Sequence, residues 1–112
     1  MERLEIASWQ QTLASLSQSE KLLTFDVNTL CHELCYSRTQ LNALFKQTFC
    51  MTPHDYLINE RLMHAKNLLL NTNLSIADIA AKTGFSGTMR FYVNFKRVFG
   101  MTPSAFRKRT QR

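Results

Sequence analysis

The sequence TPHDYLINERLMHAKNLLLN, residues 52–71, begins in the first of two copies of one motif, ends before the second, and decides the fold. The first copy is LNALFKQTFCMTPHDY (residues 41–56), and the second is FYVNFKRVFGMTPSAF (residues 91–106), at a constant offset of 50 residues (Lys46 to Lys96). A repeat of this length indicates two copies of one supersecondary unit. The sequence therefore predicts two similar units that residues 52–71 hold apart.

Residues 52–71 have the features of a single long helix. Thr52 suits the N-cap, Pro53 suits the first helical position, and Asp55 can satisfy a free backbone donor. Apolar residues then recur at helical spacing until Asn71, namely Tyr56, Leu57, Ala65, Leu68 and Leu69. A helix of about 18 residues is roughly 27 Å long at 1.5 Å per residue.

Short helices are expected on both sides of this segment. Before it we expect helices over residues 4–16 and 27–34, the second capped by Asp26, with a connection between them that docks Leu22, Leu23 and Phe25 on the core. After it, a capping box at Ser75 and Asp78 opens a helix to Lys82, and a last short helix runs over 103–107 before a basic tail.

Two further helices match between the copies. Ser37 caps a helix over residues 38–49, and its counterpart runs over about 87–99, after a turn at Gly84. The expected buried faces are Leu41, Leu44, Phe45 and Thr48 in the first helix and Phe91, Phe95 and Val98 in the second. A short helix, a tight turn and a second helix with a polar outer face form a helix-turn-helix.

The two copies are not identical. Upstream of Phe91 the offset falls to 49 (Ser37 to Ser86), which predicts one extra residue at the start of the helix over about 87–99. Where the second copy has Gly84 and Gly100, the first has Cys35 and Cys50. A cysteine in the left-handed conformation costs about 1 kcal/mol relative to glycine. The first unit is therefore expected to be slightly strained or differently capped.

These elements predict an all-α chain of about seven helices. We divide it into a first helix-turn-helix subdomain (1–51), a connecting helix (52–72) and a second helix-turn-helix subdomain with a basic C-terminal tail (73–112), together forming a single domain. Recognition helices that enter successive major grooves lie about 34 Å apart. A rod of roughly 27 Å with a helix packed at each end has about that reach.

The charge of the chain is concentrated in its last third. The net charge is +6, and after Asp78 there are eight basic residues and no acidic one. The eight are Lys82, Arg90, Lys96, Arg97, Arg107, Lys108, Arg109 and Arg112. This asymmetry favours a polyanionic partner, since each neutralised phosphate releases counterions. A solvated, solubilising surface accounts for the charge equally well at this point.

The combined motifs resemble the DNA-binding domain of the AraC/XylS family of bacterial transcription regulators. The matching pieces are LSIADIA (residues 74–80), GFS (84–86), the Phe91 and Phe95-Lys96 spacing, and GMTPSAFR (100–107). The resemblance covers residues 26–107 and implies a homeodomain-like pair of helix-turn-helix units whose third and sixth helices read adjacent major grooves of double-stranded DNA. It further implies transcription activation through RNA polymerase.

The resemblance assigns roles to particular side chains. The base-reading positions are Arg38, Thr39, Gln40, Asn42 and Ala43 in the first helix and Thr88, Met89, Arg90, Tyr92 and Val93 in the second. The phosphate contacts are Lys46, Lys96 and Arg97. Where this chain has Val93, family members often carry Arg, and where it has Met89, they often carry polar residues. The second helix is therefore expected to read thymine methyl groups and DNA shape.

Other function classes find little support in the residues. The sequence has no glycine-rich phosphate loop, nucleophile elbow or His-Glu metal motif, so neither an enzyme nor a cofactor is expected. The vicinity of Cys31, His32 and Cys35 lacks the spacing and fourth ligand of a zinc site, and Cys31 reads as a small core residue. The repeated phenylalanines read as core rather than as a base-stacking platform.

The remaining expectations concern the setting of the chain. No apolar run is long enough to span a membrane, no signal peptide is recognised, and an odd cysteine count suggests free thiols, so we expect a cytoplasmic protein. Family members usually carry a further sensor, receiver or dimerisation domain, for which 112 residues leave no room. The chain then reads as a stand-alone regulator or, preferably, an excised C-terminal part. The alternative function is a helical protein-interaction module whose basic surface aids solubility.

Overall fold

The computed structural model describes residues 2–110, and its regular elements are all helical over that range. Seven α-helices and one 3-10 helix follow in the order α1 Glu2–Gln18, η1 Lys21–Thr24, α2 Val27–Leu34, α3 Arg38–Phe49, α4 Pro53–Asn71, α5 Ile76–Lys82, α6 Thr88–Phe99 and α7 Pro103–Thr110. The predicted all-α class with about seven helices is confirmed. Arg112, counted in the basic tail, lies outside the described residues.

The chain divides into two compact units inside α4. The first unit comprises residues 1–57 and the second comprises residues 58–112. The first turn of α4 is opened by Thr52, whose Oγ1 accepts a hydrogen bond from the backbone N–H of Asp55 at 3.1 Å, as the Thr-Pro pattern predicted. One continuous helix of 19 residues therefore ends the first unit and begins the second.

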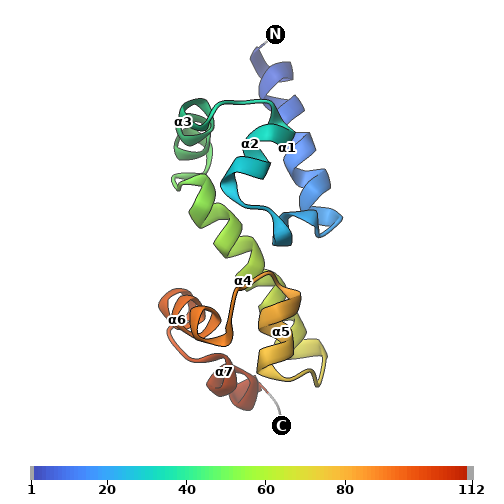
Figure 1. Ribbon diagram of the computed structural model, residues 1–112, viewed down its shortest axis with the longest axis vertical. Helices are drawn as coiled ribbons and strands as arrows, with labels where there is room; N and C mark the ends of the chain where they lie inside the picture. The colour runs from blue at the N-terminus through green and yellow to red at the C-terminus, as the bar shows by residue number, and fades with distance from the viewer. Residues whose placement is uncertain (1, 111–112) are drawn as a thin grey trace. The chain divides into compact units, whose positions relative to one another are not determined.

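The first unit buries one aromatic and aliphatic cluster. Its buried members are Trp9, Leu13, Leu16, Leu22, Val27, Leu30, Leu34, Leu41, Phe45 and Leu57. Trp9 of α1 lies 5.6 Å from Phe45 of α3 between ring centroids, and Tyr56 of α4 lies 5.2 Å from the same ring. α1, α2, α3 and the start of α4 thus enclose this core (Figure 1). The expected docking of Leu22, Leu23 and Phe25 is confirmed.

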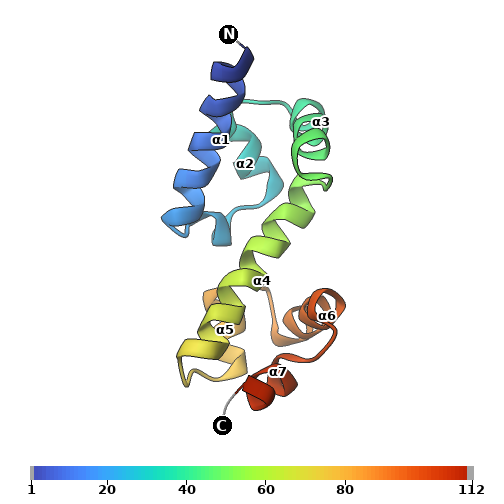
Figure 2. The same cartoon turned by 180° about the vertical axis from the view of Figure 1, so that it is seen from behind.

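The second unit repeats this arrangement. Its buried members are Ile58, Leu62, Ala65, Leu69, Ile79, Ala80, Phe85, Phe91 and Phe95. A run of rings continues from Phe85 to Phe91, Phe95 and Phe99, with centroid separations between 4.5 and 5.6 Å, and reaches Phe106 of α7. Figure 2 shows α5, α6 and α7 around the C-terminal part of α4. The phenylalanines are core side chains, as the sequence predicted.

The structural repeat is longer than the sequence repeat. In the first unit, α1 precedes the helix-turn-helix and the start of α4 follows it. In the second unit, the end of α4 precedes the helix-turn-helix and α7 follows it. α4 therefore has two equivalents, α7 for its first turns and α1 for its last turns.

Two predictions of buried residues are wrong. Thr48 on α3 is exposed, and Val98 on α6 is 45% exposed. Both lie in the last turn of their helix, beyond the fully buried Phe45 and Phe95. Helical periodicity places them toward the buried side, but the last turn extends past the side chains that cover the rest of that face.

Three element boundaries also differ from the expectation. α1 extends to residues 2–18, and α7 continues to Thr110, so part of the expected tail is helical. α6 begins at Thr88 because Gly87, in extended backbone, is its N-cap. α3 and α6 then both have 12 residues, at an offset of 50 (Arg38 to Thr88). The extra residue of the second copy is therefore Ser86 in the turn, and α6 itself has no insertion.

Each unit ends its two helix-turn-helix helices with the same cap. Cys35 and Cys50 have φ of 62° and 58°, and Gly84 and Gly100 have φ of 90° and 78°. The N–H of Tyr36 donates to Cys31 O and that of Phe85 to Ala80 O, so the first caps are equivalent hydrogen-bonded turns. The first unit is not differently capped, and its two cysteines adopt the left-handed conformation that favours glycine.

Within the described residues, no helix has the length and apolar character needed to cross a membrane.

Replacing Cys50 by glycine is expected to stabilise the protein by about 1 kcal/mol, since glycine adopts the left-handed backbone without a Cβ clash. The reciprocal change, Gly100→Ala, should destabilise it by about the same amount. A Cβ at Gly100 meets nothing within 4 Å, so the cost there arises from the backbone alone. Urea denaturation of each variant measures both effects. Cys50→Ala removes the thiol but keeps the Cβ, and stabilisation by this control would contradict the backbone explanation.

Candidate nucleic-acid interface

The start of α3 is fixed by a complete capping box. Ser37 Oγ accepts from the backbone N–H of Gln40 at 3.2 Å, and Gln40 Oε1 accepts from the backbone N–H of Ser37 at 3.0 Å. Both partners satisfy donors that the first turn of a helix leaves free. Gln40, a predicted base-reading residue, therefore uses its side-chain oxygen in the cap of its own helix.

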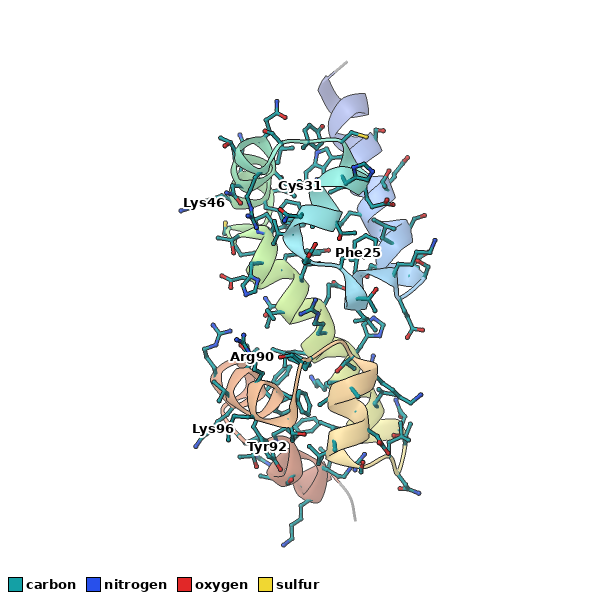
Figure 3. The ribbon with its side chains drawn as sticks, in the orientation of Figure 1. Phe25, Cys31, Lys46, Arg90, Tyr92 and Lys96 are labelled. Atoms are coloured by element: carbon teal, nitrogen blue, oxygen red, sulfur yellow. The ribbon has the colours of Figure 1, made fainter. Side chains whose placement is uncertain are left out.

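The rotation of α3 about its axis is set by two side chains. Leu41 and Phe45 are fully buried, one helical turn apart. The predicted contact residues of this helix are all exposed, namely Arg38, Thr39, Gln40, Asn42, Ala43 and Lys46. The structure therefore brings the whole predicted set onto the solvent side of one helix. Figure 3 shows Lys46 extending outward from α3.

The helix that precedes α3, α2, is capped by a carboxylate. Asp26 at the start of α2 accepts a hydrogen bond from the backbone N–H of Thr29 at 2.7 Å. This bond, more than the nearby positive charge of Arg38, lowers the pKa of the Asp26 carboxyl below its usual value. Asp26 is thus ionised at neutral pH and confirms the expected N-cap of α2.

The rotation of α6 about its axis is also set by two buried side chains. Phe91 and Phe95 are fully buried, while Met89 and Val93 are 74% and 58% exposed. Exposed apolar side chains of this size are available for contact with a partner surface. Arg90 and Lys96 are also exposed and extend from α6 in Figure 3.

Two predicted contact residues on α6 have partners within the protein. The Tyr92 hydroxyl lies 3.1 Å from Ser104 Oγ on α7, and its side chain is half-buried. Arg97 Nη2 donates to Asn94 Oδ1 at 2.8 Å, and Asn94 Nδ2 donates to Arg90 O at 2.9 Å. Asn94 therefore holds the Arg97 side chain along the helix surface. Neither Asn94 nor Ser104 was singled out from the sequence, because each acts only through a neighbour that the fold supplies.

The cysteines do not form a cluster with other ligating side chains. Cys31 is half-buried against the core of the first unit, in agreement with its interpretation as a core residue. Cys35 and Cys50 are exposed free thiols. Within residues 2–110, no group of three His, Cys, Asp or Glu side chains is arranged to hold a metal ion.

A family model described as a helix-turn-helix domain matches residues 30–109 of the chain. A solved AraC-type regulator from Chromobacterium violaceum has the same fold, with a TM-score of 0.83, 27% identity and 95% of each chain covered. The chain belongs to the AraC-type helix-turn-helix family. Its resemblance to that family, and the two helix-turn-helix units expected from it, are thereby confirmed.

Other proteins that the chain resembles are described as regulators of transcription. The transcriptional activator RhaR of Yersinia pseudotuberculosis is 40% identical over 85 residues, which are 76% of this chain and 29% of RhaR. The DNA-binding domain of AdpA, solved in complex with a target DNA, has a TM-score of 0.82 and 26% identity, with 90% of each chain covered. A further curated relative, 33% identical, is matched over 38% of its length. The chain thus spans about a third of the length of these curated relatives.

Replacing Ser37 by alanine is expected to lower the free energy of unfolding by about 1 kcal/mol, because the capping box at the start of α3 loses its hydroxyl acceptor. Thermal or urea unfolding measures the loss. Ser86→Ala is the matched control and should change stability by less than about 0.5 kcal/mol, since the N-cap of α6 is Gly87. Equal losses in the two variants would show that Ser86 also caps its helix.

Proposed function

We propose that this chain binds double-stranded DNA sequence-specifically in bacterial transcription regulation by inserting α3 and α6 into adjacent major grooves. The observation that carries this proposal is the duplicated orientation of the two helices. Each has 12 residues, and each is turned by two fully buried side chains so that the predicted contact residues of α3 and most of those of α6 face solvent. Duplicated reading surfaces suit a duplex whose grooves repeat.

The length of α4 supports reading in tandem. α4 has 19 residues and is about 28 Å long at 1.5 Å per residue. Major grooves on one side of the duplex recur about every 34 Å. A helix of this length, shared by two helix-turn-helix units, suits a single chain that binds two neighbouring half-sites.

The two helices offer different chemistry to base edges. On α3, Thr39 and Asn42 supply hydrogen-bonding groups, and an asparagine pairs best with adenine. On α6, Met89 and Val93 supply apolar contact for thymine methyl groups, while Arg90 can donate to guanine. Thr88 and the ring of Tyr92 complete the proposed surface of α6, with the Tyr92 hydroxyl held by Ser104.

Contacts to phosphates are proposed for Lys46, Lys96 and Arg97. All three are exposed on the reading helices, and the chain carries a net charge of +6. Such contacts fix the position of a protein on DNA without selecting sequence. The similarity to the AdpA domain bound to its target DNA supports this use of the basic surface and disfavours the alternative of a protein-interaction module.

The wider role is proposed from the relatives. Similarity to the activator RhaR supports activation, with RNA polymerase as a partner. The greater length of the relatives supports cooperation with a sensor, receiver or dimerisation domain. A DNA-binding regulator of this kind acts in the bacterial cytoplasm, and its chemistry is binding rather than catalysis.

The proposal is tested by selecting bound sequences from a random duplex library at moderate salt with the 112-residue chain. Two short preferred blocks about one helical turn apart are expected. A single block would contradict tandem reading, and no enrichment would contradict sequence-specific binding by this chain.

Replacing Asn42 by alanine is expected to weaken binding to the selected site by roughly 1 to 3 kcal/mol and to relax the preference in one block, since two base-edge hydrogen bonds are lost. Competition binding with single-base variants of the site measures both. Thr48→Ala, exposed on the same helix beside its buried face, is the control and should leave the preference intact. An unchanged preference in Asn42→Ala would mean that α3 does not read bases through this face.

Replacing Lys96 by alanine is expected to weaken binding to every sequence alike and to reduce the slope of log K against log salt by about 1, because one phosphate contact is lost. Titrations at several salt concentrations give the slope. Lys21→Ala removes the same charge from η1, outside both reading helices, and should leave the slope unchanged. A sequence-dependent loss in Lys96→Ala would instead indicate a base contact.

A further inference from the structure

Arg107 of α7 donates hydrogen bonds to three backbone carbonyls far away in the sequence. Its Nε donates to Leu69 O at 3.3 Å, its Nη2 donates to Thr72 O at 3.1 Å, and its Nη1 donates to Leu74 O. The guanidinium is half-buried at this place. Charge counting groups Arg107 with the other basic residues of the last third of the chain, but its guanidinium donates to backbone carbonyls of the protein.

The three carbonyls lie where α4 ends and the link to α5 begins. Leu69 is in the last turn of α4, whose carbonyls have no partner within the helix. A positive guanidinium at this end is also favoured by the helix dipole. Leu74 directly precedes Ser75, the N-cap of α5. Arg107 therefore holds both the exit of α4 and the entry to the second helix-turn-helix.

α7 also contacts α6. Ser104 Oγ lies 3.1 Å from the Tyr92 hydroxyl. The Phe106 ring lies 5.6 Å from that of Phe95 and 6.5 Å from that of Phe99. α7 thus contacts the reading helix through Ser104 and Phe106 and the α4–α5 link through Arg107.

The first unit has an apolar residue at the corresponding position. At the repeat offset of 50, Leu57 corresponds to Arg107, and it is only 2% exposed in the core of the first unit. The link from α1 to α2 there forms η1, with Leu22 buried. Apolar burial holds that link, whereas hydrogen bonds from Arg107 hold the link in the second unit.

We propose that Arg107 is a positioning residue for base reading by α6 and makes no phosphate contact itself. The proposal rests on the proposed DNA-binding function. Without the three hydrogen bonds, α7 is no longer fastened to the α4–α5 link, and α6 loses a support on the side that α7 covers. Base readout depends on directional contacts, so a looser α6 loses discrimination first, while the exposed phosphate-binding groups still reach the duplex.

The test compares Arg107→Gln, Arg107→Lys and Arg109→Gln in the full chain, at a temperature where circular dichroism shows each variant to be folded. Library selection reports the preference in each block, and salt titration reports the number of phosphate contacts. Arg107→Gln is expected to lose about tenfold preference in one block, equivalent to one mismatched base pair, with the other block and the salt slope unchanged. Arg109→Gln, an equal charge change at an exposed position of α7, should keep both preferences.

Arg107→Lys separates positioning from charge. A lysine keeps the positive charge but cannot reproduce the planar fork that reaches three carbonyls. Arg107→Lys should therefore fail to restore the sequence preference that Arg107→Gln loses in one block. Recovery of both blocks by lysine, or a salt slope lowered in Arg107→Gln with both blocks retained, would overturn the proposal.

The proposed function and this inference fail in different ways. If the unmodified chain selects no sequence, DNA reading itself is contradicted. If the unmodified chain selects two blocks and Arg107→Gln selects the same two equally well, only the positioning role is contradicted.

Discussion

The structure depends on two pairs of buried side chains, which fix the rotation of α3 and of α6 about their axes. Leu41 with Phe45, and Phe91 with Phe95, are fully buried one helical turn apart. An amphipathic helix anchored along one stripe can present only the opposite stripe to solvent. The cores of both units are built around these anchors, and the polar, basic and apolar groups on the outer faces take their directions from them.

α4 contributes side chains to the cores of both units. Its residue Leu57 is buried in the first core, and the next residue, Ile58, is buried in the second. Consecutive residues of a helix are separated by about 100° around its axis, so two cores can be supplied from different faces of the same turn.

Most of the fold was predictable because its signals are local. Helix starts at Thr-Pro, helix N-caps at Asp26 and Ser37, and helix ends at glycine depend only on neighbouring residues. Because the motif is repeated, most elements could also be predicted from two separate stretches of sequence. What could not be predicted depends on distant partners. The exposure of Thr48 and Val98 reflects where covering side chains end, and the turn position of Ser86 appears only when the two N-caps are aligned. The site residues followed from the family resemblance, but the partners of Gln40 and Tyr92, and the carbonyls bound by Arg107, required coordinates.

The unlike outer faces of α3 and α6 give the chain a direction. One face carries Thr39 and Asn42 and the other carries Met89 and Val93, so exchanging the two units would not reproduce the same surface. A dimer with twofold symmetry reads a palindrome identically from either end. A single chain with two different faces does not, and under the proposed function an inverted site would turn the bound protein end for end. The order of the two half-sites along the DNA would then encode which way the regulator points.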